Sequence, residues 1–118
     1  MALTENVEGP IQQIVWAWTT DASGDVTETT TGKYSGRLFT VVTIPGAAAA
    51  APTADYDLTV TDANSVDLLH AGGADRHTAN TEYIQEANLG VVANSAITFT
   101  VANGGNAKSG TVIVNIGT

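Results

Sequence analysis

The stretch DYDLTVTD, residues 55–62, alternates between apolar and polar side chains over most of its length. Tyr56, Leu58 and Val60 fall on one side of an extended chain, and the two leading aspartates and the threonines fall on the other side. Successive side chains of a β-strand point to opposite faces of the sheet. The alternation therefore predicts a strand with one buried face and one face in water.

Several other segments show the same two-residue period. The apolar residues that share a face are Ile14, Trp16 and Trp18 in segment 11–20, Ile97, Phe99 and Val101 in segment 96–102, and Val112, Val114 and Ile116 in segment 111–116. Segment 37–44 is mostly apolar on both faces, which predicts an interior strand, whereas the threonine-rich segment 26–31 predicts an edge strand. Segments 66–69 and 81–86 are shorter candidates. We therefore predict an all-β fold of seven to eight short strands, an antiparallel β-sandwich or small barrel of jelly-roll or Ig-like type.

Glycine, proline, asparagine and aspartate mark the connections between these segments. The turns at 21–24 and 63–65 each predict a hairpin between the strands on either side. The alanine-rich segment 45–54 is interpreted as an exposed, mobile connector, with a short helix as the alternative because alanine favours helix. Residues 87–92 are expected to form a loop with apolar side chains turned inward, and residues 103–110 are expected to project as a flexible hairpin loop.

Length and composition indicate one small domain. We place a single β-sandwich domain at residues 11–118 of the 118-residue chain, after an N-terminal arm at residues 1–10. The chain has no cysteine, so its stability depends on packing and strand pairing rather than on disulfides. Its first residues do not resemble a secretory signal, and the alanine run at 47–51 is too short to span a membrane. We expect a soluble protein made in the cytoplasm, without membrane contact.

The charge of the chain is strongly negative. Twelve acidic and four basic residues give a formal net charge of −8. Such a surface repels the phosphates of nucleic acids. Direct binding of nucleic acid is therefore not expected.

The residue types that usually carry catalysis do not form a known motif. His70 and His77 lie near Asp67 and Asp75, but without the spacing of a zinc or acid–base site. The aspartates at positions 55, 57 and 62 lack the glycine and the distal glutamate of a calcium loop. The two Gly-Gly pairs do not match a phosphate loop, and no serine lies in a nucleophile elbow. We expect neither an enzyme nor a protein that holds a cofactor or metal.

Aromatic residues and loops are the candidates for contact with a partner. Trp16 and Trp18 share a face with Ile14, which favours a packed core pair or a subunit interface, and we expect both rings to be shielded in the assembled state. The loops at 45–54 and 103–110 are either recognition loops or unengaged connectors. The full set of candidate interface residues is Trp16, Trp18, Tyr34, Asn103, Gly104, Gly105, Asn106 and Lys108.

Several stretches together resemble a group of small structural proteins of tailed bacteriophages. They are ADYDLTVTD at 54–62, GADR at 73–76, ITFTVAN at 97–103, NAKSGTV at 106–112, WTTDASG at 18–24 and YSG at 34–36, so that the resemblance extends over most of the chain. It implies a virion component, specifically a capsid decoration or cement protein that binds the outer surface of the phage head. The implied partner is the major capsid protein, and the implied location is the capsid surface. The resemblance assigns no role to any individual residue.

Two further expectations concern assembly. A cysteine-free β-domain gains stability by forming a homo-oligomer, for which we favour a trimer, or by docking on a shell. The alternative function is a tail- or fibre-associated module that adheres to host glycans, which requires tryptophan and aspartate on exposed loops.

Overall fold

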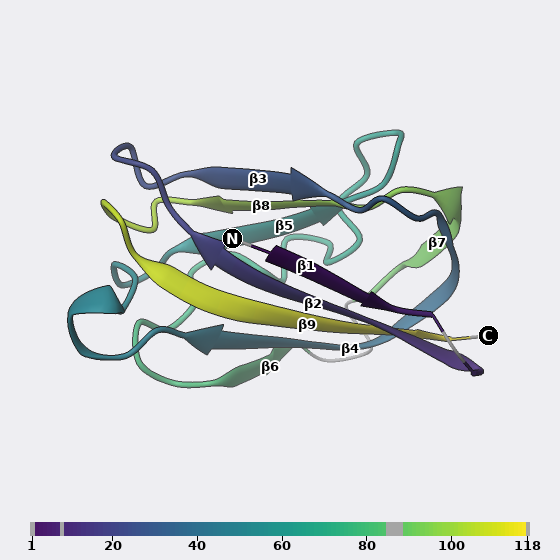
Figure 1. The fold of residues 1–118 in the computed structure, drawn as a ribbon, viewed down its shortest axis with the longest axis horizontal. Coiled ribbons are helices and arrows are strands. Elements are labelled where there is room, and N and C mark those ends of the chain that lie inside the picture. Colours follow the sequence, from purple (N-terminus) through teal and green to yellow (C-terminus); the bar gives the residue numbers. More distant parts are fainter. Residues whose placement is uncertain (1, 8, 85–88, 118) are drawn as a thin grey trace.

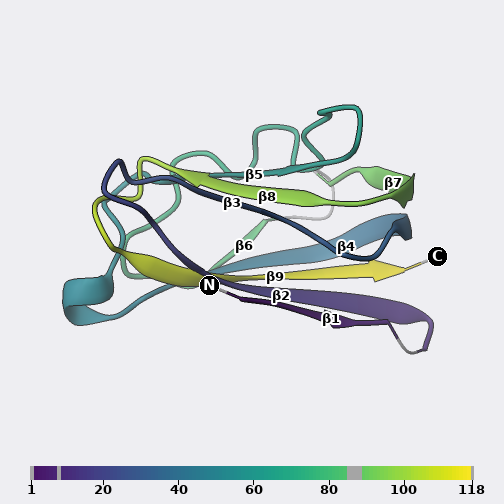
Figure 2. The ribbon, with the colours of Figure 1, turned by 45° about the horizontal axis from the view of Figure 1, so that its top comes forward.

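The computed structural model describes residues 2–7, 9–84 and 89–117, which form nine strands and one short 3-10 helix (Figure 1). In chain order the elements are β1 (Ala2–Asn6), β2 (Ile11–Thr19), β3 (Val26–Thr29), β4 (Tyr34–Pro45), η1 (Ala48–Ala50), β5 (Asp57–Thr61), β6 (Glu82–Ile84), β7 (Val91–Ser95), β8 (Thr98–Ala102) and β9 (Ser109–Gly117). They build two antiparallel sheets that stack face to face, seen most clearly in Figure 2. The all-β sandwich is confirmed, and its two separate sheets distinguish it from a closed barrel.

The larger sheet has six strands in the order β1-β2-β9-β4-β6, with β7 also paired to β4. β6 pairs with residues 41–43 of β4 and β7 pairs with residues 34–37, so the two short strands follow one another along one edge. The smaller sheet has the order β3-β8-β5. β4 and β9 are therefore interior strands, as predicted for segment 37–44.

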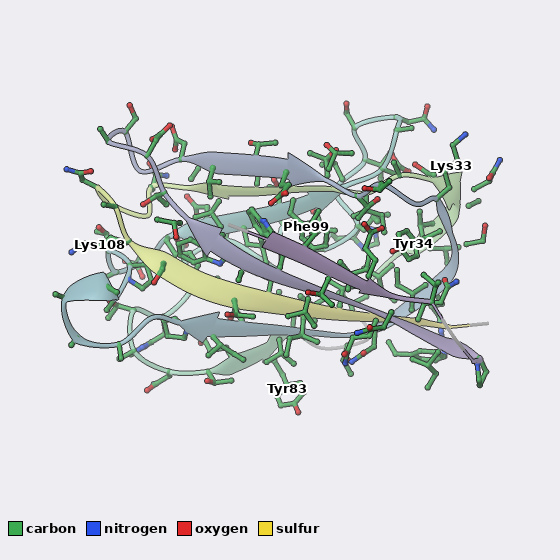
Figure 3. The ribbon with its side chains drawn as sticks, viewed as in Figure 1. Lys33, Tyr34, Tyr83, Phe99 and Lys108 are labelled. Carbon is green, nitrogen blue, oxygen red and sulfur yellow. The ribbon has the colours of Figure 1, made fainter. Side chains whose placement is uncertain are left out.

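The core lies between the two sheets and contains the residues that the alternation selected. Trp16 and Trp18 are at most 1% exposed, and Tyr56 is 1% exposed. The ring centroids of Trp16 and Phe99 are 5.4 Å apart, and those of Trp18 and Tyr56 are 5.5 Å apart. Figure 3 shows Phe99 in the space between the layers. Each tryptophan therefore joins the larger sheet to the smaller one.

The segment that we predicted as an N-terminal arm is part of the larger sheet. Residues 2–6 form β1, which pairs with β2 from Ala2↔Ala17 to Asn6↔Gln13. Leu3 packs against the core. The sandwich therefore begins at β1 rather than at residue 11.

The hairpin predicted at the turn 21–24 is wrong, because β3 does not pair with β2. Both edges of β2 are already occupied, one by β1 and the other by β9. β3 instead crosses to the smaller sheet and pairs with β8, where threonine hydroxyls face one another at Thr29–Thr98 (2.9 Å) and Thr27–Thr100 (3.2 Å). Its position at the edge of that sheet agrees with the prediction.

The second predicted hairpin is also wrong in its return strand. Residues 66–69 form turns with one isolated bridge, Thr61↔Asp67, instead of a strand. The segment nevertheless covers the free edge of β5, because the N–H of Leu68 donates to the carbonyl of Val60 (2.7 Å) and that of Leu58 donates to the carbonyl of Gly73 (2.8 Å). An uncovered strand edge would invite pairing with another chain.

The remaining connections differ from the predictions in detail. The alanine-rich segment contains a single 3-10 turn, η1, which is the short helical alternative in its smallest form. Leu89 and Val92 are buried, as expected for the loop at 87–92, but Val91 already belongs to β7, and residues 87 and 88 lie outside the described residues. No helix in the described part of the chain has the length and apolar character needed to cross a membrane.

Candidate binding surfaces

The three aromatic residues that we selected as interface candidates are buried inside the chain itself. Trp16 is fully buried, and its indole Nε1 donates to Glu28 Oε1 at 2.9 Å. Trp18 and Tyr34 are each 1% exposed. Their side chains hold the two layers together and are not at the surface that a partner would contact.

Tyr34 takes part in a clasp that fastens β1 to the loop between β3 and β4. Its hydroxyl donates to Glu5 Oε1 at 2.7 Å, and the same carboxylate accepts the backbone N–H groups of Gly32 (3.0 Å) and Thr31 (3.2 Å). Burial alone would raise the pKa of Glu5, but the hydrogen bonds from Tyr34, Gly32 and Thr31 outweigh it and hold the pKa below its ordinary value. Burial, followed by the Glu5 carboxylate, raises the pKa of Tyr34 far above its ordinary value. At neutral pH the Glu5 carboxylate is therefore ionised and the Tyr34 hydroxyl is protonated.

The other interface candidates lie in a loop that does not project as predicted. Residues 103–108 cross from β8 in one sheet to β9 in the other, so they form no hairpin. The Thr20 hydroxyl donates to the carbonyl of Gly105 (2.5 Å) and accepts the N–H of Lys108 (2.9 Å). The N–H of Gly104 donates to the carbonyl of Gly24 (2.9 Å). These bonds tie the loop to the β2–β3 turn.

A third connection joins the same end of the sandwich. The N–H of Thr53 donates to the carbonyl of Gly104 (3.0 Å), and the Lys108 ammonium donates to the carbonyl of Ala49 (2.8 Å). Figure 3 labels Lys108 at this end, beside the loop that carries η1. We call residues 20–25, 46–53 and 103–108 together the loop platform. It presents exposed side chains, including Asn103 and Asn106, on a backbone fixed by hydrogen bonds.

The close approach of these loops requires glycine at position 24. Gly24 has φ +84°, and a Cβ placed on it would lie 2.8 Å from the backbone nitrogen of Gly105. Any larger residue would be strained and would also push the two loops apart. This packing explains a glycine that we assigned from the sequence only to a turn.

Asp57 and Asp62, two of the three clustered aspartates at positions 55, 57 and 62, accept hydrogen bonds from neighbouring loops. Asp62 accepts the N–H groups of Asn64 and Val66, while one carboxylate oxygen of Asp57 accepts the N–H of Asp75 and the other accepts the side-chain amide of Asn103. No group of three or more metal-ligating side chains occurs among the described residues. Asp62 therefore holds the turn after β5 through local backbone donors, and Asp57 links β5 to the loops at 75 and 103.

In the region of the two histidines, the side chains of His77 and Asp67 accept hydrogen bonds from nearby backbone N–H groups. His77 Nδ1 accepts the N–H groups of Ala79 (2.9 Å) and Asn80 (3.0 Å). Asp67 accepts the N–H groups of Leu69 (3.1 Å) and Ala71 (2.9 Å). Asp67 thus holds the loop that covers β5, and His77 holds the turn at residues 77–80.

A surface that the sequence analysis missed lies on the outer face of the larger sheet. A row of apolar side chains crosses four strands in register, from Val15 on β2 through Ile113 on β9 and Val42 on β4 to Tyr83 on β6. Tyr83 is 70% exposed, and Figure 3 shows it pointing away from the body. We call these four residues the apolar row. A signal for it existed, because segment 37–44 is apolar on both faces, yet we used that signal only to predict an interior strand.

The neighbouring rows of this face are polar or apolar, with one charged side chain, Arg37 of β4, whose guanidinium lies 5.0 Å from the centroid of the Phe39 ring. The side-chain amide of Gln13 donates to Asn115 Oδ1 (3.1 Å), and the amide of Asn115 donates to the Thr40 hydroxyl (2.7 Å). Beside them, a hollow of about 380 Å³ is lined by Ile11, Phe39, Thr40 and Asn115. Ile11 is 55% exposed. The whole face thus offers apolar surface around a polar row whose side chains hydrogen-bond to one another.

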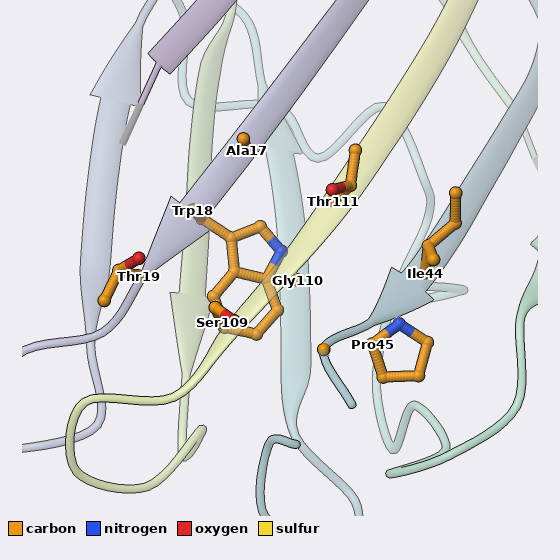
Figure 4. A pocket seen from close by; sticks show the side chains of 9 residues that line it. Ala17, Trp18, Thr19, Ile44, Pro45, Ser109, Gly110 and Thr111 are labelled. Atoms are coloured by element: carbon orange, nitrogen blue, oxygen red, sulfur yellow. The ribbon is translucent and has the colours of Figure 1, made fainter. Parts of the chain in front are cut away.

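A second hollow, of about 270 Å³, lies at the end of the larger sheet next to the loop platform (Figure 4). Its lining includes Trp18, Ile44 and Pro45, and its polar side chains are the hydroxyls of Thr19, Ser109 and Thr111. The indole Nε1 of Trp18 is buried and has no hydrogen-bond partner among the described residues. The lining has no titratable side chain that could serve as acid, base or metal ligand.

Comparison with known proteins identifies no relative. No family model matches this chain, and no curated protein matches it. Functional inference therefore depends on the surfaces described above and on the resemblance noted in the sequence.

Proposed function

We propose that this protein is a structural component of a phage particle, a capsid decoration protein that binds the outer surface of the head. The observation that supports it best is the loop platform, which combines a fixed backbone with exposed polar side chains. Of the predicted interface residues within it, Asn103 and Asn106 are exposed and Gly105 and Lys108 are partly exposed, whereas Gly104 is buried. The choice of a phage head as the partner rests on the resemblance in sequence.

A fixed loop cluster suits a protein that must bind a rigid surface. Ordering a mobile loop on binding costs conformational entropy, and a loop that is already held in place avoids most of that cost. Hydrogen bonds through Thr20 and Gly104 hold the platform before any partner arrives. The platform would then contact the major capsid protein and place the chain on the virion surface.

The alternative of a glycan-binding adhesion module has less support. Glycan recognition by this chain would need an exposed tryptophan on a loop, and both Trp16 and Trp18 lie inside strand β2 with at most 1% exposure. We therefore retain the decoration protein as the proposal.

The test is co-sedimentation with purified phage heads that were assembled without this chain. We expect the chain to bind the heads and to raise their melting temperature, because a ligand that binds only the assembled state stabilises it. Asn106→Glu, on the platform, should weaken binding, whereas the matched Asn64→Glu, in the exposed turn at the other end of the sandwich, should bind like the wild type. Failure of the wild-type chain to bind heads would contradict the proposal.

A further inference from the structure

We propose that the outer face of the larger sheet packs against the same face of a second copy of this chain, giving a dimer with two-fold symmetry. The inference goes beyond the role on a phage head and does not depend on it. It rests on how charge, apolar area and hydrogen bonding are distributed on that face.

The distribution of charge allows two copies to meet through the outer face of the larger sheet. Each copy has a formal net charge of −8, so most approaches bring acidic residues together. β2, β4 and β9 contain no acidic residue. Glu5 on β1 and Glu82 on β6 are paired with the inward-facing positions Ile14 and Thr43, so their side chains point away from the outer face. Contact through this face keeps the described acidic residues of both copies out of the interface.

The face is large enough for a stable pair. β2 and β9 have nine residues each and lie within a row of five strands. With a rise of about 3.3 Å per residue and a spacing of about 4.8 Å between strands, the face measures about 30 by 24 Å, or roughly 700 Å² per copy. Two copies would bury about 1,400 Å², within the range of about 1,200–2,000 Å² found for specific interfaces.

Burial of this face would retain two hydrogen bonds within its polar row. Gln13, Asn115 and Thr40 hydrogen-bond to one another across β2, β9 and β4. A buried polar group is costly mainly when it lacks a partner. The apolar row beside it supplies the side chains that would interdigitate as in an ordinary sandwich, with the two sheets about 10 Å apart.

A second copy fits these observations better than a foreign partner does. Apart from Arg37, whose guanidinium lies 5.0 Å from the centroid of the Phe39 ring, the described residues of this face carry no charge by which a different protein could be selected, whereas the apolar row can pack against the same row of a second copy. A two-fold axis along the strands would place both loop platforms on the same side of the dimer. Such a dimer could therefore present two platforms to one surface.

The test is sedimentation equilibrium of the full chain, whose single-copy mass is 12.1 kDa. At about 100 µM, a concentration at which a micromolar dimer is mostly formed, we expect twice that mass. Higher salt should tighten the pair, because it screens the remaining repulsion between acidic surfaces. The single-copy mass at every concentration, or three times that mass, would overturn the inference.

Substitutions at Val42, in the middle of the apolar row, distinguish the effect of a charge placed in the interface from the effect of the net charge of the chain. Val42→Glu makes each copy more negative and Val42→Lys makes it less negative, yet both place a charge in the interface, so each should weaken pairing by about 100-fold or more. The control Thr59→Glu adds the same negative charge on the exposed face of the smaller sheet and should leave pairing nearly unchanged. Tyr83→Glu, at a position that is 70% exposed, provides the same test if a Val42 variant does not fold. Wild-type pairing by the folded interface variants would overturn the inference, whereas head binding reports separately on the proposed function.

Discussion

Replacing Tyr34 by phenylalanine removes the hydroxyl that fastens β1 to the loop between β3 and β4. In the folded chain this hydroxyl donates to Glu5 Oε1 at 2.7 Å from a side chain that is 1% exposed. A hydrogen bond to a charged group contributes about 1.5–3 kcal/mol to stability. Glu5 is partly exposed and keeps the backbone donors of Thr31 and Gly32, so we expect a loss of about 1.5 kcal/mol, at the lower end of that range.

The same substitution should change how stability depends on pH. The pKa of Glu5 is lower in the folded chain than its ordinary value. Its ionised form therefore stabilises the fold at pH values above the unfolded-state pKa, and this contribution is lost as the pH falls through the lower folded-state pKa. The pKa of Tyr34 is raised, so its hydroxyl stays protonated throughout this range. We expect the full difference between wild type and Tyr34→Phe at pH 7 and a smaller one below about pH 4.

Urea unfolding followed by tryptophan fluorescence measures this difference at both pH values. The matched control is Tyr83→Phe, which removes a hydroxyl from a side chain that is 70% exposed and should change stability by less than about 0.5 kcal/mol. If Tyr34→Phe is as stable as the wild type at pH 7, or if the difference is the same at pH 3 as at pH 7, the clasp does not stabilise the fold as we describe.

Three further predictions address the core and the loop platform. Phe99→Ala should cost about 3–5 kcal/mol in the same urea assay, because the ring packs 5.4 Å from Trp16 in the centre of the core; a loss under about 1 kcal/mol would contradict this packing. Gly24→Ala should cost about 1–3 kcal/mol, because φ is +84° and the added Cβ would lie 2.8 Å from the nitrogen of Gly105; unchanged thermal stability would show that the loops are not tightly packed. Trp16 and Trp18 are at most 1% exposed, so acrylamide should quench their fluorescence weakly in the native free chain, and quenching as strong as in urea would be inconsistent with the core described.

The alternation of apolar and polar residues was sufficient to predict most strands and their buried faces. Tyr56, Leu58 and Val60 are buried as the stretch at 55–62 predicts. A strand with one apolar face removes that face from water only by packing it against another layer. The two-residue period of the other segments predicted the all-β class in the same way. β1 was missed because its sequence, ALTEN, has one large apolar residue, so the sheet edge on β2 decides its structure.

The partners of the strands and the roles of single polar residues depended on tertiary contacts. The turn at 21–24 looks like a hairpin turn, yet β2 had no free edge, so β3 joined the other sheet. A loop that looked free, 103–108, is held by Thr20 and Gly24, which lie about 80 positions earlier in the chain. The partner of a strand or loop depends on which backbone donors and acceptors remain unpaired near it in the folded chain. The local sequence does not contain that information.

For the candidate surfaces, too, some features could be predicted from the sequence and others could be seen only in the folded chain. Composition and period are local properties, and they were enough to predict a small, acidic, all-β domain without the motif of a known catalytic site. The burial of Trp16, Trp18 and Tyr34 became visible only in the folded chain. The same holds for the apolar row of Val15, Ile113, Val42 and Tyr83, because that row exists only through the register of four strands. Side chains 98 positions apart, as Val15 and Ile113 are, become neighbours when backbone hydrogen bonds align their strands.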